Sequence, residues 1–175
     1  ADPMTVDQLQ SRIGHVFAIY GGAAAVVGKP PAADLPTLSG RNLLRGFEID
    51  ETYGRLGLYA VIEYRHDLLD LGGGRLPAAS TFERLQGALF AGGGTMSEPS
   101  GYGGLFTGER LFAEAGYGLR LHMLAFGLSQ YLLALDVAVP LWPDDRTYEV
   151  GQADGSTARA SRAPLKVVFG ITQTY

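Results

Sequence analysis

Charged side chains spaced along alternating stretches of the sequence are the residues best suited to chemistry. Arg45 stands in the tetrapeptide Leu44-Arg45-Gly46-Phe47, and five further charged residues lie on the polar faces of later stretches: Glu63, Arg65, Glu114, Arg120 and Asp136. A guanidinium forms strong hydrogen-bonded pairs with carboxylates, and such pairing makes charges tolerable away from water. The acids on these polar faces, Glu63, Glu114 and Asp136, are therefore the candidate partners of an arginine that lies against the same faces. The alternative is an arginine exposed on a surface loop.

The sequence contains no arrangement typical of catalysis or of a metal site. His15, His66 and His122 lack the spacing of metal ligands. Glu114 and His122 share a strand face, but their separation along a strand is about 26 Å, too far for an acid–base pair. Fingerprints of nucleophilic serine, phosphate-binding and dinucleotide-binding sites are also absent from the sequence. We predict a protein that is not an enzyme and that uses no cofactor and no metal.

Length and composition define the broad class. The 175 residues suffice for one domain, and a net charge of −4 argues against a nucleic-acid partner. Cysteine is absent, and no apolar run approaches the roughly 18 residues of a membrane-spanning helix. We interpret residues 1–12 as an expression remnant followed by a polar lead-in, and residues 13–175 as the folded domain.

Strands are expected to position the charged residues, because the apolar residues repeat with a period of two. Six strands are predicted, at residues 13–27, 55–66, 82–92, 111–122, 131–139 and 165–175. The pair Gly21-Gly22 suggests a bend or bulge in the first of them. A long connection at 28–54 carries Arg45, a turn is expected at 70–79, and loops at 93–108 and 142–164. The pattern predicts an all-β, antiparallel fold.

Alternation alone leaves open whether the apolar face packs in a soluble core or faces lipid. Two observations favour lipid. The polar faces carry glycines that suit a crowded interior, namely Gly57, Gly116, Gly118 and Gly170. Aromatic residues stand near the ends of the apolar faces, as in a membrane-interface girdle: Tyr64, Tyr131 and Tyr175. The alternative is a soluble sandwich or ligand-binding barrel with its apolar face inward.

Five short segments in order resemble the BamA, TamA and FhaC family of outer-membrane assembly and secretion barrels. They are Leu44-Arg45-Gly46-Phe47, Glu63-Tyr64-Arg65, residues 115–120, residues 133–141, and a C-terminal signal with Phe169, Ile171 and Tyr175. The resemblance implies a transmembrane β-barrel of the bacterial outer membrane that inserts or translocates proteins. It also implies that the connection at 28–54 folds back into the barrel. Ala91 stands where the family places an aspartate that pairs with the loop arginine. The resemblance therefore implies that Arg45 lies inside the barrel within salt-bridge reach of Glu63, Glu114 or Asp136 instead.

The expected partners follow from this resemblance: a lipid bilayer, unfolded outer-membrane or secreted client proteins, and further strands. Six strands are too few to close a membrane barrel, since the smallest use about eight. The chain is therefore expected to be the C-terminal part of a larger barrel, unless extra strands lie within 4–13 and 76–83 or several copies complete one another. Two alternatives stay open: a passive anchor barrel for a domain outside this chain, and a soluble ligand-binding β-protein.

Overall fold

A computed structural model describes residues 14–40, 43–48, 51–75, 81–125, 129–142, 147–151 and 157–174. Within them, six strands form one antiparallel sheet in the order β1-β2-β3-β4-β5-β8, and β6 and β7 form a separate hairpin. The strands are β1 (His15–Ala25), β2 (Leu56–Arg75), β3 (Thr81–Met96), β4 (Leu111–Ala125), β5 (Ser129–Trp142), β6 (Thr147–Gly151), β7 (Thr157–Ser161) and β8 (Lys166–Thr174). The predicted all-β antiparallel fold is confirmed.

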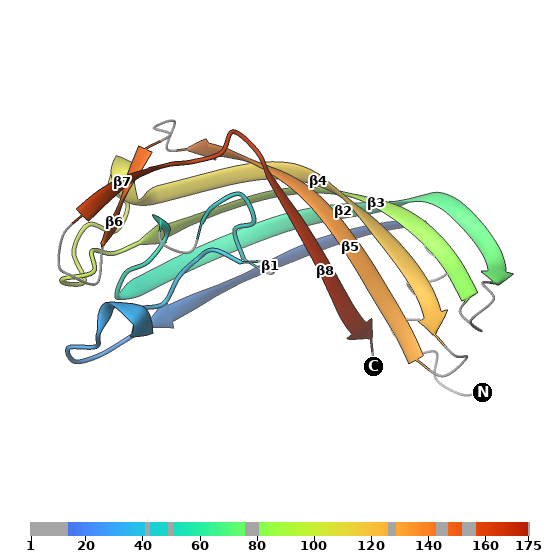
Figure 1. The fold of residues 1–175 in the computed structure, drawn as a ribbon, viewed down its shortest axis with the longest axis horizontal. Coiled ribbons are helices and arrows are strands. Elements are labelled where there is room, and N and C mark those ends of the chain that lie inside the picture. Colours follow the sequence, from blue (N-terminus) through green and yellow to red (C-terminus); the bar gives the residue numbers. More distant parts are fainter. Residues whose placement is uncertain are drawn as a thin grey trace.

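Figure 1 shows the six-stranded sheet as an arch, with the connection between β1 and β2 lying beneath it. The 3₁₀ turn η1 (Ala32–Asp34) lies in that connection, and the 3₁₀ turn η3 (Gly108–Arg110) precedes β4. No helix in the described ranges is long and apolar enough to cross a membrane.

Several strands are longer than the sequence predicts. β2 continues through the expected turn to Arg75, with register shifts between Asp67 and Leu69 and between Asp70 and Gly74. β3 continues through Gly93 and Gly94 to Met96, where a loop was expected. At Gly94 a Cβ atom would lie 2.8 Å from both the Leu38 side chain and the Leu58 carbonyl oxygen. This glycine therefore lets the connection approach the strand.

The bulge predicted at Gly21-Gly22 is wrong. The pairing of β1 with β2 runs without interruption from His15↔His66 to Ala25↔Leu56. A Cβ atom on Gly21 would lie 2.6 Å from the Tyr59 carbonyl oxygen, and one on Gly22 would lie 2.9 Å from the Tyr59 ring. Both glycines make room for Tyr59 on the neighbouring strand.

The loop predicted at 142–164 is also wrong in part. It contains the hairpin of β6 and β7, paired from Thr147↔Ser161 to Gly151↔Thr157. The hairpin does show a period of two, with Tyr148 and Val150 in one strand and Ala158 and Ala160 in the other, but each strand is only five residues long. Arg162, expected in an exposed loop, is buried just after β7.

The two faces of the sheet have opposite character, and we call the face toward the connection the inner face. Buried charged and polar residues lie on it: Glu63, Gln86, Glu114, Arg120 and Asp136. The opposite, outer face exposes large apolar residues on all six strands, among them Phe17, Ile62, Leu89, Leu119, Leu135 and Phe169. The soluble alternative needs this apolar face packed in a core, but Phe17, Leu89 and Phe169 on it are 65 %, 51 % and 63 % exposed. The buried apolar side chains lie instead between the connection and the inner face. There Leu38, Leu44 and Phe47 of the connection pack with Met96 on β3 and Phe112 on β4.

We expect Gly116→Ala to destabilise the fold by about 1–3 kcal/mol, the usual cost of overpacking. A methyl group at Gly116 would overlap the Phe90 ring and the Val137 carbonyl oxygen, and the backbone atom cannot move aside. Urea unfolding measures the change. Gly103→Ala is the control, since no atom lies within 4 Å of the position that a Cβ would take there. Equal midpoints for the two variants would contradict the packing described.

Candidate functional site

The connection between β1 and β2 folds into a compact turn that presents Arg45 to the inner face. Leu44 N–H donates to the Leu38 carbonyl at 2.8 Å, and Gly40 N–H donates to the Leu44 carbonyl at 3.2 Å. The Ser39 hydroxyl donates to the Phe47 carbonyl at 2.5 Å. Leu44 and Phe47 are fully buried on either side of Arg45. These contacts fix the tetrapeptide by its apolar residues and its backbone, and the guanidinium extends toward the strands.

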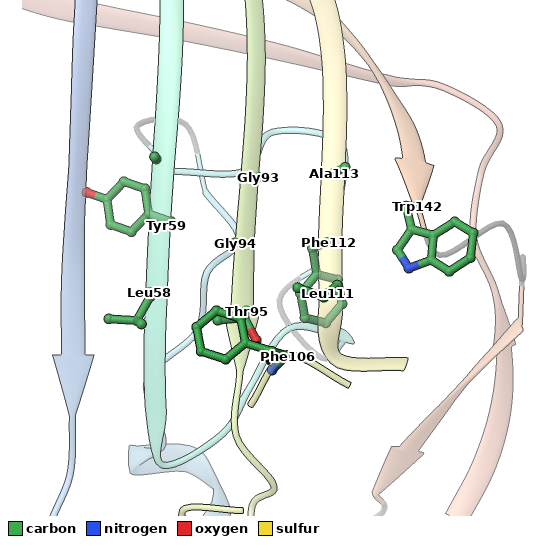
Figure 2. A pocket seen from close by; sticks show the side chains of 11 residues that line it. Leu58, Tyr59, Gly93, Gly94, Thr95, Phe106, Leu111, Phe112, Ala113 and Trp142 are labelled. Carbon is green, nitrogen blue, oxygen red and sulfur yellow. Dashed lines mark hydrogen bonds between the residues drawn. The ribbon is translucent and has the colours of Figure 1, made fainter. Parts of the chain in front are cut away.

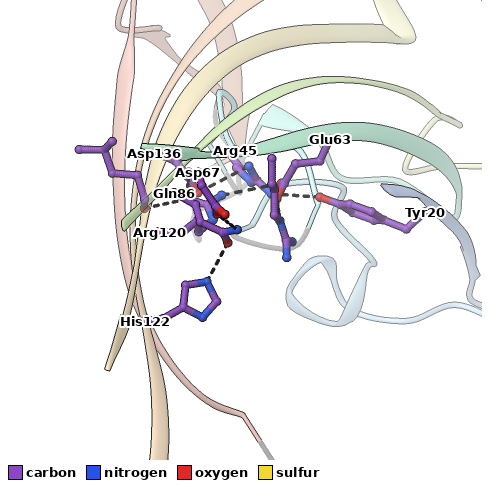
Figure 3. Close-up of polar contacts among 10 residues, drawn as sticks. Tyr20, Arg45, Glu63, Asp67, Gln86, Arg120, His122 and Asp136 are labelled. Carbon is purple, nitrogen blue, oxygen red and sulfur yellow. Dashed lines mark hydrogen bonds and ion pairs between the residues drawn. The ribbon is translucent and has the colours of Figure 1, made fainter. Parts of the chain in front are cut away.

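Arg45 lies among groups from four strands of the sheet (Figure 3). Its Nη2 donates to Glu63 Oε2 at 2.8 Å and to the Tyr20 hydroxyl at 3.0 Å. Its Nη1 lies 3.6 Å from Asp136 Oδ2, and its guanidinium carbon stands 4.2 Å from the centre of the Phe90 ring. The predicted ion pairing of Arg45 is confirmed for two of the three candidate carboxylates.

Burial and pairing act in opposite directions on the charge of Arg45. Removal from water acts to lower the pKa of Arg45, but the hydrogen bond to Glu63 and the charges of Asp136 and Glu63 outweigh it. The pKa of Arg45 is raised as a result. The connection therefore carries a permanent positive charge onto the inner face.

Glu114, the third candidate, holds the backbone of the same turn. Its Oε2 accepts a hydrogen bond from Gly46 N–H at 2.5 Å. A Cβ atom on Gly46 would lie 3.1 Å from that oxygen and 3.3 Å from the Pro140 nitrogen. The glycine after Arg45 thus suits the close approach of the turn to β4 and β5, where a side chain would require its neighbours to shift.

We expect Glu114→Ala to destabilise the fold by about 1–3 kcal/mol, because Gly46 N–H would stay buried without its acceptor. Glu114→Gln retains a carbonyl acceptor of the same length and should lose clearly less. Urea titration of both variants, followed by tryptophan fluorescence, measures the difference. A glutamine variant as unstable as the alanine variant would show that the charge, and not the hydrogen bond, carries the stability.

Glu63 forms ion pairs with all three arginines of the ion-pair cluster, Arg45, Arg65 and Arg120. Arg65 Nε lies 2.6 Å from Glu63 Oε1, and Arg120 Nη2 lies 3.7 Å from Glu63 Oε2. Arg120 also forms an ion pair with Asp136. Every residue of the predicted interior polar set is therefore in one neighbourhood, with Glu114 joined to it through Gly46. Pairing of this kind offsets part of the large cost of removing charges from water.

Two groups of contacts at the site are not among those predicted from the sequence pattern of charged residues. The first extends the polar set along the inner face: Gln86 Nε2 donates to Asp67 Oδ1 at 2.7 Å, and Gln86 Oε1 lies 2.8 Å from His122 Nε2. Asp67 continues the period of two from Glu63 and Arg65, a signal that could have identified it.

The second group ties the connection to the far edge of the sheet. Lys166 on β8 donates to the Phe47 carbonyl at 2.8 Å and lies 3.0 Å from Glu48 Oε2. Arg162 forms an ion pair with Glu51, and its guanidinium carbon lies 5.0 Å from the centre of the Phe47 ring. Nothing in the polar sequence around Arg162 distinguishes it from exposed neighbours.

The expected position of an aspartate at Ala91 requires correction. Ala91 pairs with Ile62 and Ala115, so it lies on the outer face. The inner position beside it belongs to Phe90, whose ring lies against Arg45. Arg45 thus meets an aromatic face from β3, and its carboxylates come from β2 and β5.

The C-terminal signal is placed only in part. Phe169 and Ile171 lie on the outer face of β8 and are 63 % and 58 % exposed. Tyr175, the lead-in at 1–12 and most of the segment at 76–83 lie outside the described residues.

Comparison of the chain with models of protein families, with curated proteins and with solved structures gives no match. The site must therefore be judged on its geometry. Among the described residues, no group of three His, Asp or Glu side chains could hold a metal ion. The hydrogen bonds and ion pairs of the site hold the connection against β1, β2, β4, β5 and β8.

Proposed function

We propose that the sheet forms part of the wall of a membrane-spanning β-barrel in a bacterial outer membrane. The observation that carries the proposal is the inverted distribution of the two faces, with paired charges buried and large apolar side chains exposed. A soluble protein rarely exposes an apolar surface of this extent. A barrel in lipid has this distribution, with an apolar exterior and a polar interior.

Strand length supports the same proposal. β2, β3, β4 and β5 contain 20, 16, 15 and 14 residues. A tilted strand needs only about 9–11 residues to cross the apolar layer of a bilayer. Each of these strands can therefore cross and extend beyond the membrane.

The two edges of the sheet require partners in lipid. Among the described strands, β1 pairs only with β2, and β8 pairs only with β5. Backbone groups left unpaired in the apolar layer cost several kcal/mol each. Further strands, from a longer chain or from other copies, complete the wall.

The activity that best fits this wall is insertion or translocation of proteins. It is supported by the five segments that resemble the outer-membrane assembly family and by the locked turn around Arg45. An accessible sheet edge offers a template on which strands of an unfolded client can pair. A passive membrane anchor is the second candidate, because the connection is fixed to the inner face by contacts from Tyr20 on β1 to Lys166 on β8.

Reconstitution tests the proposal. The full chain, refolded into phospholipid vesicles, is expected to resist extraction by alkaline carbonate and to accelerate folding of an unfolded outer-membrane protein added outside. Resistance without acceleration would favour the anchor. Release by carbonate would reject a membrane-spanning wall.

A further inference from the structure

The outer face contains a hollow near one end of the sheet (Figure 2). Its volume is about 620 Å³, within the range of small-ligand pockets. Small residues from three adjacent strands form its floor: Ala60 on β2, Gly93 on β3 and Ala113 on β4. Larger side chains of Leu58, Phe106 and Trp142 surround it. The pocket is thus a gap in the row of large apolar residues that covers the rest of this face.

Two features of the pocket walls keep polar groups away from its interior. Phe106 adopts a φ of 64°, a left-handed conformation that bulky residues rarely occupy. Its N–H donates to Thr95 Oγ1 at 3.0 Å, which holds the loop over the outer face. The indole Nε1 of Trp142 donates to the Gly108 carbonyl at 2.9 Å. Both walls use their hydrogen-bonding groups within the chain and present carbon to the pocket.

We propose that this pocket binds an acyl chain of a membrane phospholipid. The inference rests on the proposed membrane-spanning wall, because the pocket is continuous with the face assigned there to lipid. A peptide segment would bring N–H and C=O groups that this lining cannot pair, and burying them unpaired is costly. An acyl chain has no such groups. Tryptophan is also enriched where the lipid chains meet the headgroups, and Trp142 stands at the end of β5.

Trp142 makes the proposal testable, because it is the only tryptophan of the chain. The full chain is reconstituted in vesicles of phosphatidylcholine that contain a minor share of lipid brominated on the acyl chains, which quenches nearby indole fluorescence. Ala60→Phe and Ala113→Phe fill the pocket from opposite sides. Ala91→Phe is the matched control, since Ala91 lies on the outer face of β3 and does not line the pocket.

The expected result is strong quenching of the unsubstituted chain and of Ala91→Phe, with loss of most of it in both filling variants. Equal quenching in all four proteins would overturn the proposal, because Trp142 would then only contact bulk lipid. The proposal would also be overturned if Trp142 were unquenched in chains that resist extraction by alkaline carbonate. That result would assign the pocket to a protein segment. Extraction of the chain by carbonate would reject the proposed membrane-spanning wall itself. Failure of the proposed function is therefore distinguishable from failure of the lipid-binding pocket.

Discussion

Arg45→Ala is expected to destabilise the fold by about 3–5 kcal/mol, the usual cost of removing one partner from a buried ion pair. Glu63 and Asp136 are almost fully buried, and each would lose a cation within 4 Å. The Tyr20 hydroxyl and the Phe90 ring would lose their contacts as well. Urea unfolding in detergent or vesicles, together with loss of heat-resistant mobility on a gel, measures the effect.

Two further variants define the cause. Arg45→Lys keeps the charge but cannot reproduce the planar fork or the stacking on Phe90, so it should recover only part of the loss. Lys29→Ala removes a cation from an exposed position of the same connection and should change stability by less than about 1 kcal/mol. If Arg45→Ala behaved like Lys29→Ala, the ion-pair cluster would have no role in holding the connection.

Leu135→Arg should destabilise the reconstituted chain by about 2–4 kcal/mol, the cost of an arginine on the lipid-facing side near the membrane midplane. Leu135 lies on the outer face in the middle of β5, between Leu119 and Phe169 on the adjacent strands. The fraction that keeps its folded gel mobility during urea titration in vesicles measures the loss.

The control for this substitution is Val27→Arg. Val27 is 87 % exposed and lies beyond the end of β1, so an arginine there stays in water and should have little effect. A Leu135→Arg variant as stable as Val27→Arg would mean that the outer face is not in contact with lipid.

The period-two pattern predicts much of this fold because it depends only on alternation between two faces. It identifies all six strands of the sheet and places Glu63, Glu114, Arg120 and Asp136 together on the inner face. Strand ends are less predictable, since glycine occurs both in turns and where another segment packs closely. Gly94 belongs to the second kind, and the sequence does not distinguish it from the first.

The partners of Arg45 were predictable only as a set of candidates. Which carboxylate meets the guanidinium depends on the path of the connection, and that path depends on the burial of Leu38, Leu44 and Phe47. Glu114 consequently holds Gly46 and not the Arg45 side chain. The face of Ala91 depends on strand register, which a short motif match cannot provide.

The cluster around the connection also has a consequence for the order of events during folding. Glu114 follows Gly46 by 68 residues, and Lys166 follows Phe47 by 119. Contacts between such distant parts of a chain form slowly, because a large loop must close before they can be made. Only 18 residues separate Arg45 from Glu63, whereas the contacts of the connection with β4 and β8 join much more distant parts of the chain. We therefore expect the local contact of Arg45 with Glu63 to form before the contacts of the connection with β4, β5 and β8.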